Sequence, residues 1–147
     1  MWRPASLADD DDVVAMCLAL FAEDPGEAMS EDKIRRTLAA FRAEPARGRA
    51  VVLERDGALV GYALLSSFWS NEYGGETCTI DELYVTPAHR GRGLGTTLFA
   101  AIEEDRALWP QRPALLALEV TPDNARARAL YERLGFRARN ALLRRKS

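Results

Sequence analysis

The sequence Arg90-Gly91-Arg92-Gly93-Leu94-Gly95-Thr96 joins a strand-like segment that ends at Val85 to an apolar-periodic segment that begins near Leu94. Glycine readily adopts the positive-φ conformations that let a backbone curl with its N–H groups pointing inward. The helix that follows adds its free N-terminal donors and the positive end of its dipole. The stretch therefore predicts an anion cradle, in which the main chain holds a phosphate first and Arg90 or Arg92 second.

Two familiar nucleotide-binding motifs fit this turn poorly. A dinucleotide fingerprint needs a third glycine where Thr96 stands. A P-loop needs a Lys followed by Ser or Thr at the helix start, and the turn has no such pair. Taken alone, the motif leaves two interpretations open, an anion cradle and a tight turn that binds nothing.

The composition is that of an ordinary soluble protein, and its 147 residues fit one domain spanning 1–147. A formal net charge of −2 gives no general attraction to nucleic acid or to an anionic membrane. No apolar run is long enough to span a bilayer. Cys17 and Cys78 are far apart and His89 is the only histidine, so we expect buried thiols, a cytoplasmic location and no metal site.

Apolar periodicity and turn residues predict the order β-α-α-β-β-β-α-β-α-β, an α/β domain with a mixed, mostly antiparallel central sheet flanked by helices. The Asp56-Gly57 pair predicts a hairpin between two of the strands. In the first half of the chain we expect a strand over 2–6, a helix carrying Val13 to Phe21, a helix capped by Ser30, and strands over 50–54, 58–65 and 77–85. In the second half we expect a helix from Leu94 that ends near Trp109, a strand over 114–120, a helix capped by Asp123 or Asn124, and a last strand-like segment from Phe136.

Two segments leave alternatives open. The acidic run Asp9-Asp10-Asp11-Asp12 is typical of a helix start, where acids face the positive end of the dipole, and substrate binding is the alternative. Ser66 to Gly75 has the composition of an irregular loop, with Phe68, Trp69 and Tyr73 among polar residues. Such aromatic side chains either form a ligand wall or pack onto the sheet.

Two longer motifs extend the glycine-rich turn. Leu83-x-Val85-x-Pro87-x-x-Arg90-Gly91-x-Gly93-x-Gly95 is followed, after one helix and one strand, by Asn124-x-x-Ala127-x-x-x-Tyr131-x-x-x-Gly135-Phe136. Together they resemble the GCN5-related N-acetyltransferase (GNAT) family. The Arg3-Pro4-Ala5 opening, the length and the element order also fit, so the resemblance covers nearly the whole chain. It implies the acyl-CoA N-acyltransferase fold, with strands that splay apart to open a groove.

The resemblance implies acetyl-CoA as the acyl donor. Its pyrophosphate would rest on the amides of Gly91 to Thr96, and its pantetheine arm would pair with the strand at Leu83 and Val85 like an extra strand. The Leu83 amide would hold the thioester carbonyl as it becomes negative. The residues expected to bind the donor are Leu83, Tyr84, Val85, Arg90, Gly91, Arg92, Gly93, Leu94, Gly95, Thr96, Asn124, Ala127 and Tyr131.

Three residues are candidates for catalysis. Tyr131 matches the tyrosine that protonates the departing thiolate in the enzymes it resembles; the alternative is one more apolar-face residue of its helix. Asp81 and Glu82 are candidate bases for an amine that arrives protonated. Strand alternation sends their side chains to opposite faces, so only one is expected to face the groove. The alternative for both carboxylates is pairing with nearby arginines.

The leading hypothesis is an N-acetyltransferase that moves the acetyl group to a primary amine by direct attack. Acids and aromatic residues near the presumed acceptor side favour a cationic small molecule, with a protein or peptide amine as the alternative. A non-catalytic acyl-CoA-binding regulatory module is the competing hypothesis. The acceptor's identity, the acyl chain preference, a homodimer and the completeness of the strand pair after Phe136 stay open.

Overall fold

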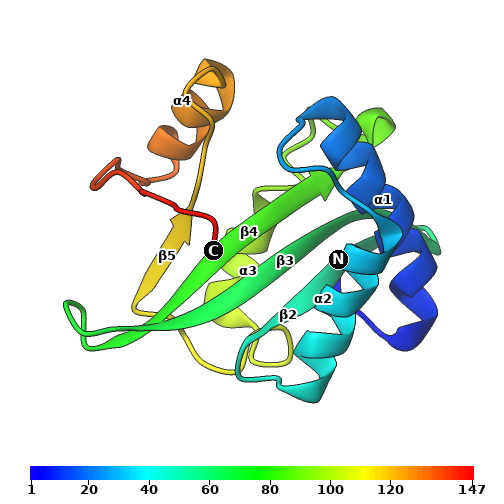
Figure 1. Cartoon of the computed structure of the whole chain (residues 1–147), viewed down its shortest axis with the longest axis horizontal. Coiled ribbons are helices and arrows are strands. Elements are labelled where there is room, and N and C mark those ends of the chain that lie inside the picture. Colours follow the sequence, from blue (N-terminus) through cyan, green and yellow to red (C-terminus); the bar gives the residue numbers. More distant parts are fainter.

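The computed structural model describes residues 1–147 and contains one five-stranded sheet in the order β1-β2-β3-β4-β5 (Figure 1). Neighbouring strands from β1 to β4 are antiparallel, whereas β5 is parallel to β4. The predicted mixed, mostly antiparallel sheet is thereby confirmed. The strands are β1 (Trp2–Pro4), β2 (Gly48–Arg55), β3 (Ala58–Ser70), β4 (Gly75–Val85) and β5 (Leu115–Leu118).

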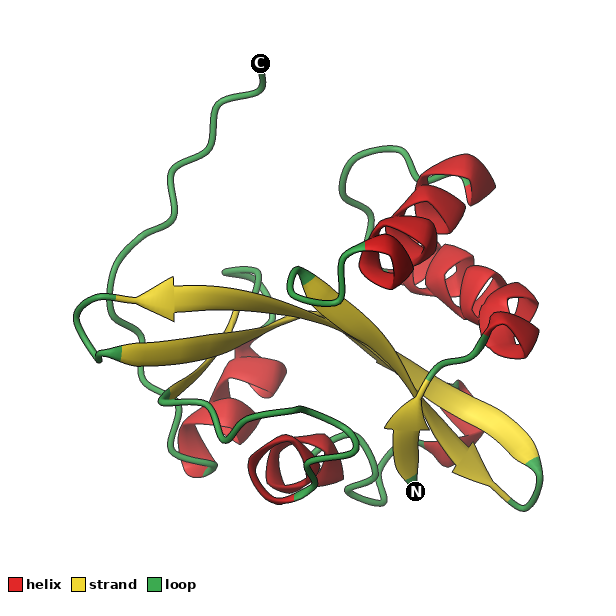
Figure 2. Ribbon diagram, turned by 90° about the horizontal axis from the view of Figure 1, so that it is seen from below, coloured by secondary structure: helices red, strands yellow, loops and turns green.

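Helices cover both faces of this sheet (Figure 2). Helices α1 (Asp10–Glu23) and α2 (Glu31–Ala43) lie on one face, and α3 (Thr97–Glu104) and α4 (Ala125–Arg133) lie on the other. Each face has its own apolar core, since burying the inner stripe of each helix is what holds it on the sheet. The α1/α2 core contains Val13, Cys17, Ile34, Leu38, Val52, Tyr62, Leu64 and Tyr84, and the α3 core contains Trp2, Val51, Leu65, Cys78, Ile80, Leu98, Phe99 and Ile102.

The acidic run stands at the start of α1, as predicted. Asp9 is buried and accepts hydrogen bonds from the Ser6 backbone and from the Arg3 guanidinium, which lowers the pKa of its carboxyl to about 2. Asp10 pairs with Arg42 of α2. The run therefore ties α1 to β1 and to α2.

The predicted loop over 66–75 is wrong. Strand β3 continues to Ser70 and β4 begins at Gly75, so the two form a long hairpin with a turn at 71–74. Antiparallel pairing from Ser66↔Thr79 to Ser70↔Gly75 satisfies the backbone groups whatever the polarity of the side chains. Phe68 and Trp69 project from this hairpin and are more than half exposed, at 67% and 61%.

Three other boundaries differ from prediction. The helix expected from Leu94 to about Trp109 covers only Thr97–Glu104, and β5 is shorter than 114–120. The last strand, expected from Phe136, does not form. Residues 137–147 take part in no backbone–backbone hydrogen bond, and β5 remains the edge of the sheet. No helix of the chain has the length and apolar character needed to cross a membrane.

Candidate functional site

Strand β4 loses one of its two partners midway along its length. It pairs with β3 up to Val85, but with β5 only where Thr77–Ile80 face Leu115–Leu118, and the two strands then diverge (Figure 1). The Thr86 amide donates to the Val60 carbonyl at 2.8 Å, so it faces β3. Because backbone groups alternate sides along a strand, those of Leu83 and Val85 face the open edge. Such an edge can pair with an extended ligand.

The glycine-rich turn that follows β4 offers a row of free donors. Gly91 and Gly93 have φ angles of 80° and 73°, in the left-handed region that glycine favours. No N–H group from Gly91 to Thr97 donates a hydrogen bond to any protein acceptor. Helix α3 begins at Thr97, which adds the positive end of its dipole. The turn thus has the backbone conformation and the donors that an anion cradle requires.

The turn packs against side chains at the end of β4. A Cβ placed on Gly95 would lie 3.6 Å from Cγ2 of Val85 and 3.8 Å from Cδ2 of Leu83. The start of α3 is also fixed by β1, because Nε1 of Trp2, in the α3 core, donates to Oγ1 of Thr97 at 3.0 Å. The cradle therefore packs on the side chains of the same β4 residues whose backbone groups face the open edge.

The two arginines of the turn differ in their contacts. Arg90 donates through Nε to the Val85 carbonyl at 2.7 Å, pairs with Glu23 of α1 at 2.7 Å, and lies over the Tyr84 ring. Its guanidinium thus braces α1 against the end of β4. Arg92 is exposed and has no hydrogen bond or ion pair in the structure, so it is the arginine whose side chain is free to approach an anion.

A bulge in β4 brings the two candidate bases to the same face of the sheet. Leu64 pairs with Glu82 and Leu65 with Ile80, which leaves Asp81 as an extra residue without a partner in β3. Glu82 accepts a hydrogen bond from Tyr62 and Asp81 accepts one from Ser66.

Tyr62 and Ser66 are an even number of residues apart on β3, so both acids lie on the α1/α2 face. The predicted opposite orientation of Asp81 and Glu82 is wrong because simple alternation fails at a bulge. Neither acid forms an ion pair with an arginine, in contrast to the alternative considered from the sequence.

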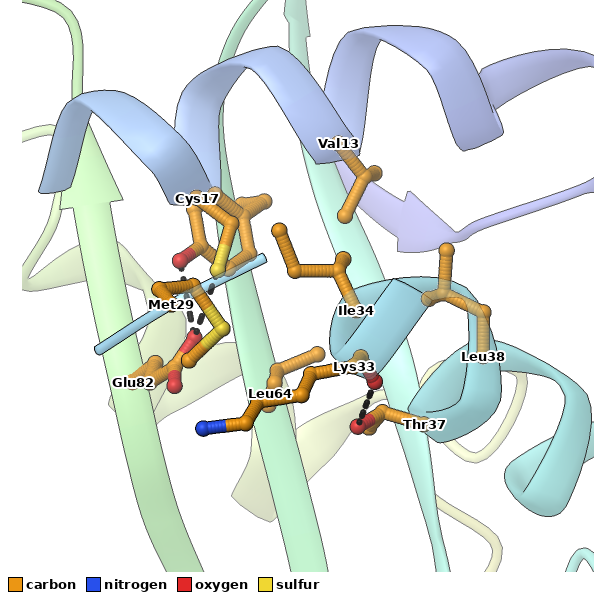
Figure 3. Close-up of a pocket in the computed structure, with 10 residues that line it drawn as sticks. Val13, Cys17, Met29, Lys33, Ile34, Thr37, Leu38, Leu64 and Glu82 are labelled. Atoms are coloured by element: carbon orange, nitrogen blue, oxygen red, sulfur yellow. Dashed lines mark hydrogen bonds between the residues drawn. The ribbon is translucent and has the colours of Figure 1, made fainter. Parts of the chain in front are cut away.

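Glu82 forms part of the wall of a small cavity of about 40 Å³ between β3, β4 and the helices α1 and α2 (Figure 3). Burial raises the pKa of the Glu82 carboxyl, and hydrogen bonds from Tyr62 and Cys17 act against that rise. Burial and the neighbouring Glu119 raise the pKa of Asp81. The cavity is lined by Val13, Cys17, Met29, Lys33, Ile34, Thr37, Leu38, Tyr62, Leu64 and Glu82.

The Tyr131 ring and hydroxyl have different environments. The ring packs edge-on against Phe99 and Phe136, with centroids 6.1 Å and 5.9 Å away, so it belongs to the apolar face of α4. The hydroxyl has no hydrogen-bond partner, and burial raises its pKa, so it stays protonated at neutral pH. Leu134, expected on the same apolar face, is 47% exposed.

Asn124 begins α4 as its N-cap. Its side-chain oxygen accepts from the Ala127 amide at 3.1 Å, which settles the choice between Asp123 and Asn124 as the cap. The side-chain NH₂ group of Asn124 makes no hydrogen bond within the protein, so it can donate to a ligand.

The sequence analysis missed the partners of Glu82. The sequence predicts Tyr62 as part of an apolar strand and Cys17 as a buried thiol, and neither prediction places them beside Glu82. A tyrosine among the small and aliphatic residues of a buried strand was the available signal, because a buried hydroxyl needs a partner.

Comparison with known proteins identifies the family. Residues 14–136 match the acetyltransferase (GNAT) family. The chain is 35% identical over 143 residues to a mycothiol acetyltransferase of Kineococcus radiotolerans, an alignment covering 96% of this chain and 43% of that protein. It is 37% identical over 93 residues to a streptothricin acetyltransferase of Streptomyces lavendulae, covering 58% of this chain and 42% of that protein. The chain thus spans less than half the length of these two relatives.

A solved structure supports the same fold. A possible acetyltransferase from Clostridium difficile 630 superposes with a TM-score of 0.81 at 21% identity, covering 100% of this chain and 96% of that one. The chain therefore belongs to the GNAT family, as its motifs had indicated, and has the acyl-CoA N-acyltransferase fold. GNAT acetyltransferases use acetyl-CoA.

Replacing Glu82 with Gln is expected to raise the free energy of unfolding at pH 7. The pKa of Glu82 is higher in the folded than in the unfolded state, so its ionisation destabilises the fold as the pH rises. The stability difference between Glu82→Gln and the native protein should become smaller as the pH is lowered toward 4, because the Glu82 carboxyl is then largely protonated in the unfolded state as well. Urea denaturation across this range measures the difference. Glu104→Gln, at an exposed position of α3, is the control, and a Glu82→Gln variant less stable than the native protein at pH 7 would contradict the expectation.

Proposed function

We propose that this chain transfers the acetyl group of acetyl-CoA to a primary amine. The observation that carries the proposal is the row of free N–H groups from Gly91 to Thr97 beside the unpaired edge of β4. A ligand that fits both must be anionic at one end and extended at the other, with amide groups able to pair with a strand. Coenzyme A has this character, and the family's use of acetyl-CoA supports the choice.

The residues of the open edge fit the donor as follows. The amides of Gly91 to Thr96 would hold the pyrophosphate, with Arg92 beside them. The backbone groups of Leu83 and the amide of Val85 would pair with the pantetheine arm, while the Val85 carbonyl accepts from Arg90. The Leu83 amide would stabilise negative charge on the thioester carbonyl. Acetyl-CoA supplies the activated acetyl group.

Other residues hold this arrangement in place. Asn124 would donate through its NH₂ group to the pantetheine, with Ala127 fixing its orientation through the cap. Tyr84 lies under the Arg90 guanidinium, which is bonded to the Val85 carbonyl. These contacts keep the end of β4 in one conformation, which lowers the ordering cost of binding.

The acceptor is proposed to be a cationic primary amine that enters on the α1/α2 side. Asp81 and Glu82 lie there without an ion pair, and Asp81 is near Glu119, so a cationic ligand would relieve the repulsion among these acids. The exposed Phe68 and Trp69 stand on the hairpin formed by the same two strands and offer ring faces to a cation. Relatives named for mycothiol and for streptothricin differ in their named substrates, so a particular amine is not assigned.

Direct attack is the proposed route. Glu82 takes one proton from the ammonium group, and the free amine nitrogen attacks the acetyl carbon. The C–S bond then breaks while Tyr131 gives its proton to the departing thiolate, and the second proton that the nitrogen loses passes through solvent and restores the Tyr131 hydroxyl. Burial raises the pKa of Cys17 to about 11 and that of Cys78 to about 12, so both thiols stay protonated at neutral pH. Protonated, buried thiols are poor nucleophiles, which favours direct transfer over an acyl-enzyme.

The function is tested by CoA release from acetyl-CoA in the presence of a panel of amines, including polyamines, aminoglycosides, amino acids and peptides. We expect release with at least one cationic amine. In the same assay Tyr131→Phe should lower kcat about 100-fold, because the general acid is lost, and should lower acetyl-CoA affinity far less, because the ring packing is kept. Acetyl-CoA binding without release for any amine would support a regulatory module instead, and unchanged kcat across pH would remove Tyr131 from the mechanism.

Gly93→Ala is expected to weaken CoA binding about tenfold, because a side chain at a φ of 73° costs about 1–2 kcal/mol and shifts the turn. Gly57→Ala is the matched control: Gly57 has a φ of 78° in the turn between β2 and β3 and takes no part in the proposed site. Both variants should lose similar stability, but only the first should lose affinity in isothermal titration calorimetry. Equal CoA affinities for the two variants would argue against the cradle.

A further inference from the structure

A polar cluster of Glu82, Tyr62 and Cys17 is enclosed between the sheet and α1. The Tyr62 hydroxyl donates to Oε1 of Glu82 at 2.8 Å, and the Cys17 thiol lies 3.5 Å from the same oxygen. Tyr62 is fully buried and Cys17 is 2% exposed. In Figure 3 two of the dashed lines meet at one oxygen of the Glu82 carboxylate.

The two donors hold one carboxylate oxygen and leave the other free. Both protein hydrogen bonds to the Glu82 side chain end on Oε1, and Oε2 accepts none. A carboxylate fixed through one oxygen cannot rotate freely, so the second oxygen keeps a defined direction. That is the arrangement a base needs, because a proton acceptor must stay within hydrogen-bond reach of its proton.

Packing alone does not explain this cluster. The surrounding residues Val13, Ile34 and Leu64 are apolar, and a phenylalanine at position 62 would fill most of the same space. Burying a hydroxyl, a thiol and a carboxylate in such a core costs free energy unless each finds a partner. The three side chains satisfy one another's hydrogen-bonding groups, and removing any one of them leaves a buried polar group without that partner.

We infer that Tyr62 and Cys17 are positioning residues for the reaction, which hold Oε1 of Glu82 so that Oε2 takes the proton of the acceptor amine. The inference rests on the proposed function, since it assigns parts of the same active site. Asp81, on the same face, has no such anchor in the core and accepts only from Ser66. The geometry therefore favours Glu82 over Asp81 as the base.

The titratable groups that face Glu82 come from every element packed around it. They are Cys17 from α1, Lys33 from α2 at the cavity wall, Tyr62 from β3 and Asp81 from β4 itself. The hydrogen bonds from Tyr62 and Cys17 lower the pKa of Glu82, whereas burial and Asp81 raise it. Removing either donor therefore makes the carboxylate harder to ionise.

The test is the pH profile of kcat/KM for Tyr62→Phe and Cys17→Ala. The acid limb of Tyr62→Phe should move to higher pH by about one unit, the scale of one hydrogen bond to a charged group. Cys17→Ala should move it the same way by about half as much, since a thiol is a weak donor. Cys78→Ala, another fully buried cysteine with no bond to Glu82, is the control for lost packing and should leave the limb in place.

Two further measurements distinguish a positioning role of Tyr62 from a purely structural one. They also distinguish failure of the inference from failure of the proposed function. In a Glu82→Gln background, Tyr62→Phe should produce no further shift of the profile. Titration of the Glu82 carboxyl by ¹³C NMR needs no turnover and should show the same upward shift in Tyr62→Phe. Acetyl transfer with an unmoved acid limb would overturn the inference and leave the function standing. An unmoved NMR titration would overturn it even if no amine were acetylated.

Discussion

The separation of β4 from β5 beyond Ile80 is the constraint on which the site depends. Up to that residue β4 has a strand on each side, and beyond it only β3 remains. Main-chain groups that lose a strand partner must bond to water or to a ligand, because leaving them unpaired is costly. A single 3₁₀ turn, Pro87–His89, separates the open edge from the turn whose amides are also free. The strand edge and the anion cradle are thus close in the chain and suit one extended, anionic ligand.

The bulge at Asp81 has a second consequence for the same strand. It turns two successive carboxylates toward the α1/α2 face while Leu83 and Val85 still pack toward α3. Tyr131 packs against the α3 core as well. In the proposed reaction Glu82 accepts a proton from one face of the sheet and Tyr131 donates a proton from the other face. Both can reach the reacting atoms only at the part of β4 that has no neighbouring strand.

Features set by local conformational preference could be predicted from the sequence. The glycine-rich turn, the Asp56-Gly57 hairpin and the caps at Ser30 and Asn124 all follow from what those residue types do to their own backbone. The Asp56-Gly57 turn likewise predicted that the two strands beside it pair antiparallel. These features also carry the motifs that indicate the family.

Features set by pairing between distant segments could not be predicted. The extra residue at Asp81 exists only because of the register with β3, and period-two alternation placed its side chain on the wrong face. The sequence predicts Arg90 as a phosphate ligand. In the structure its guanidinium pairs with Glu23, which lies 67 residues away in sequence. The extension of β3 through Ser70 also depends on its partner strand rather than on its own polar and aromatic residues.

The most direct measurement is the response of the backbone amides to CoA in ¹H–¹⁵N NMR spectra. The account predicts that the amide protons of Gly91 to Thr97, together with those of Leu83 and Val85, shift downfield as they gain acceptors, while that of Gly57 stays in place. Saturating CoA that leaves the Gly91 to Thr97 amides unchanged would contradict it.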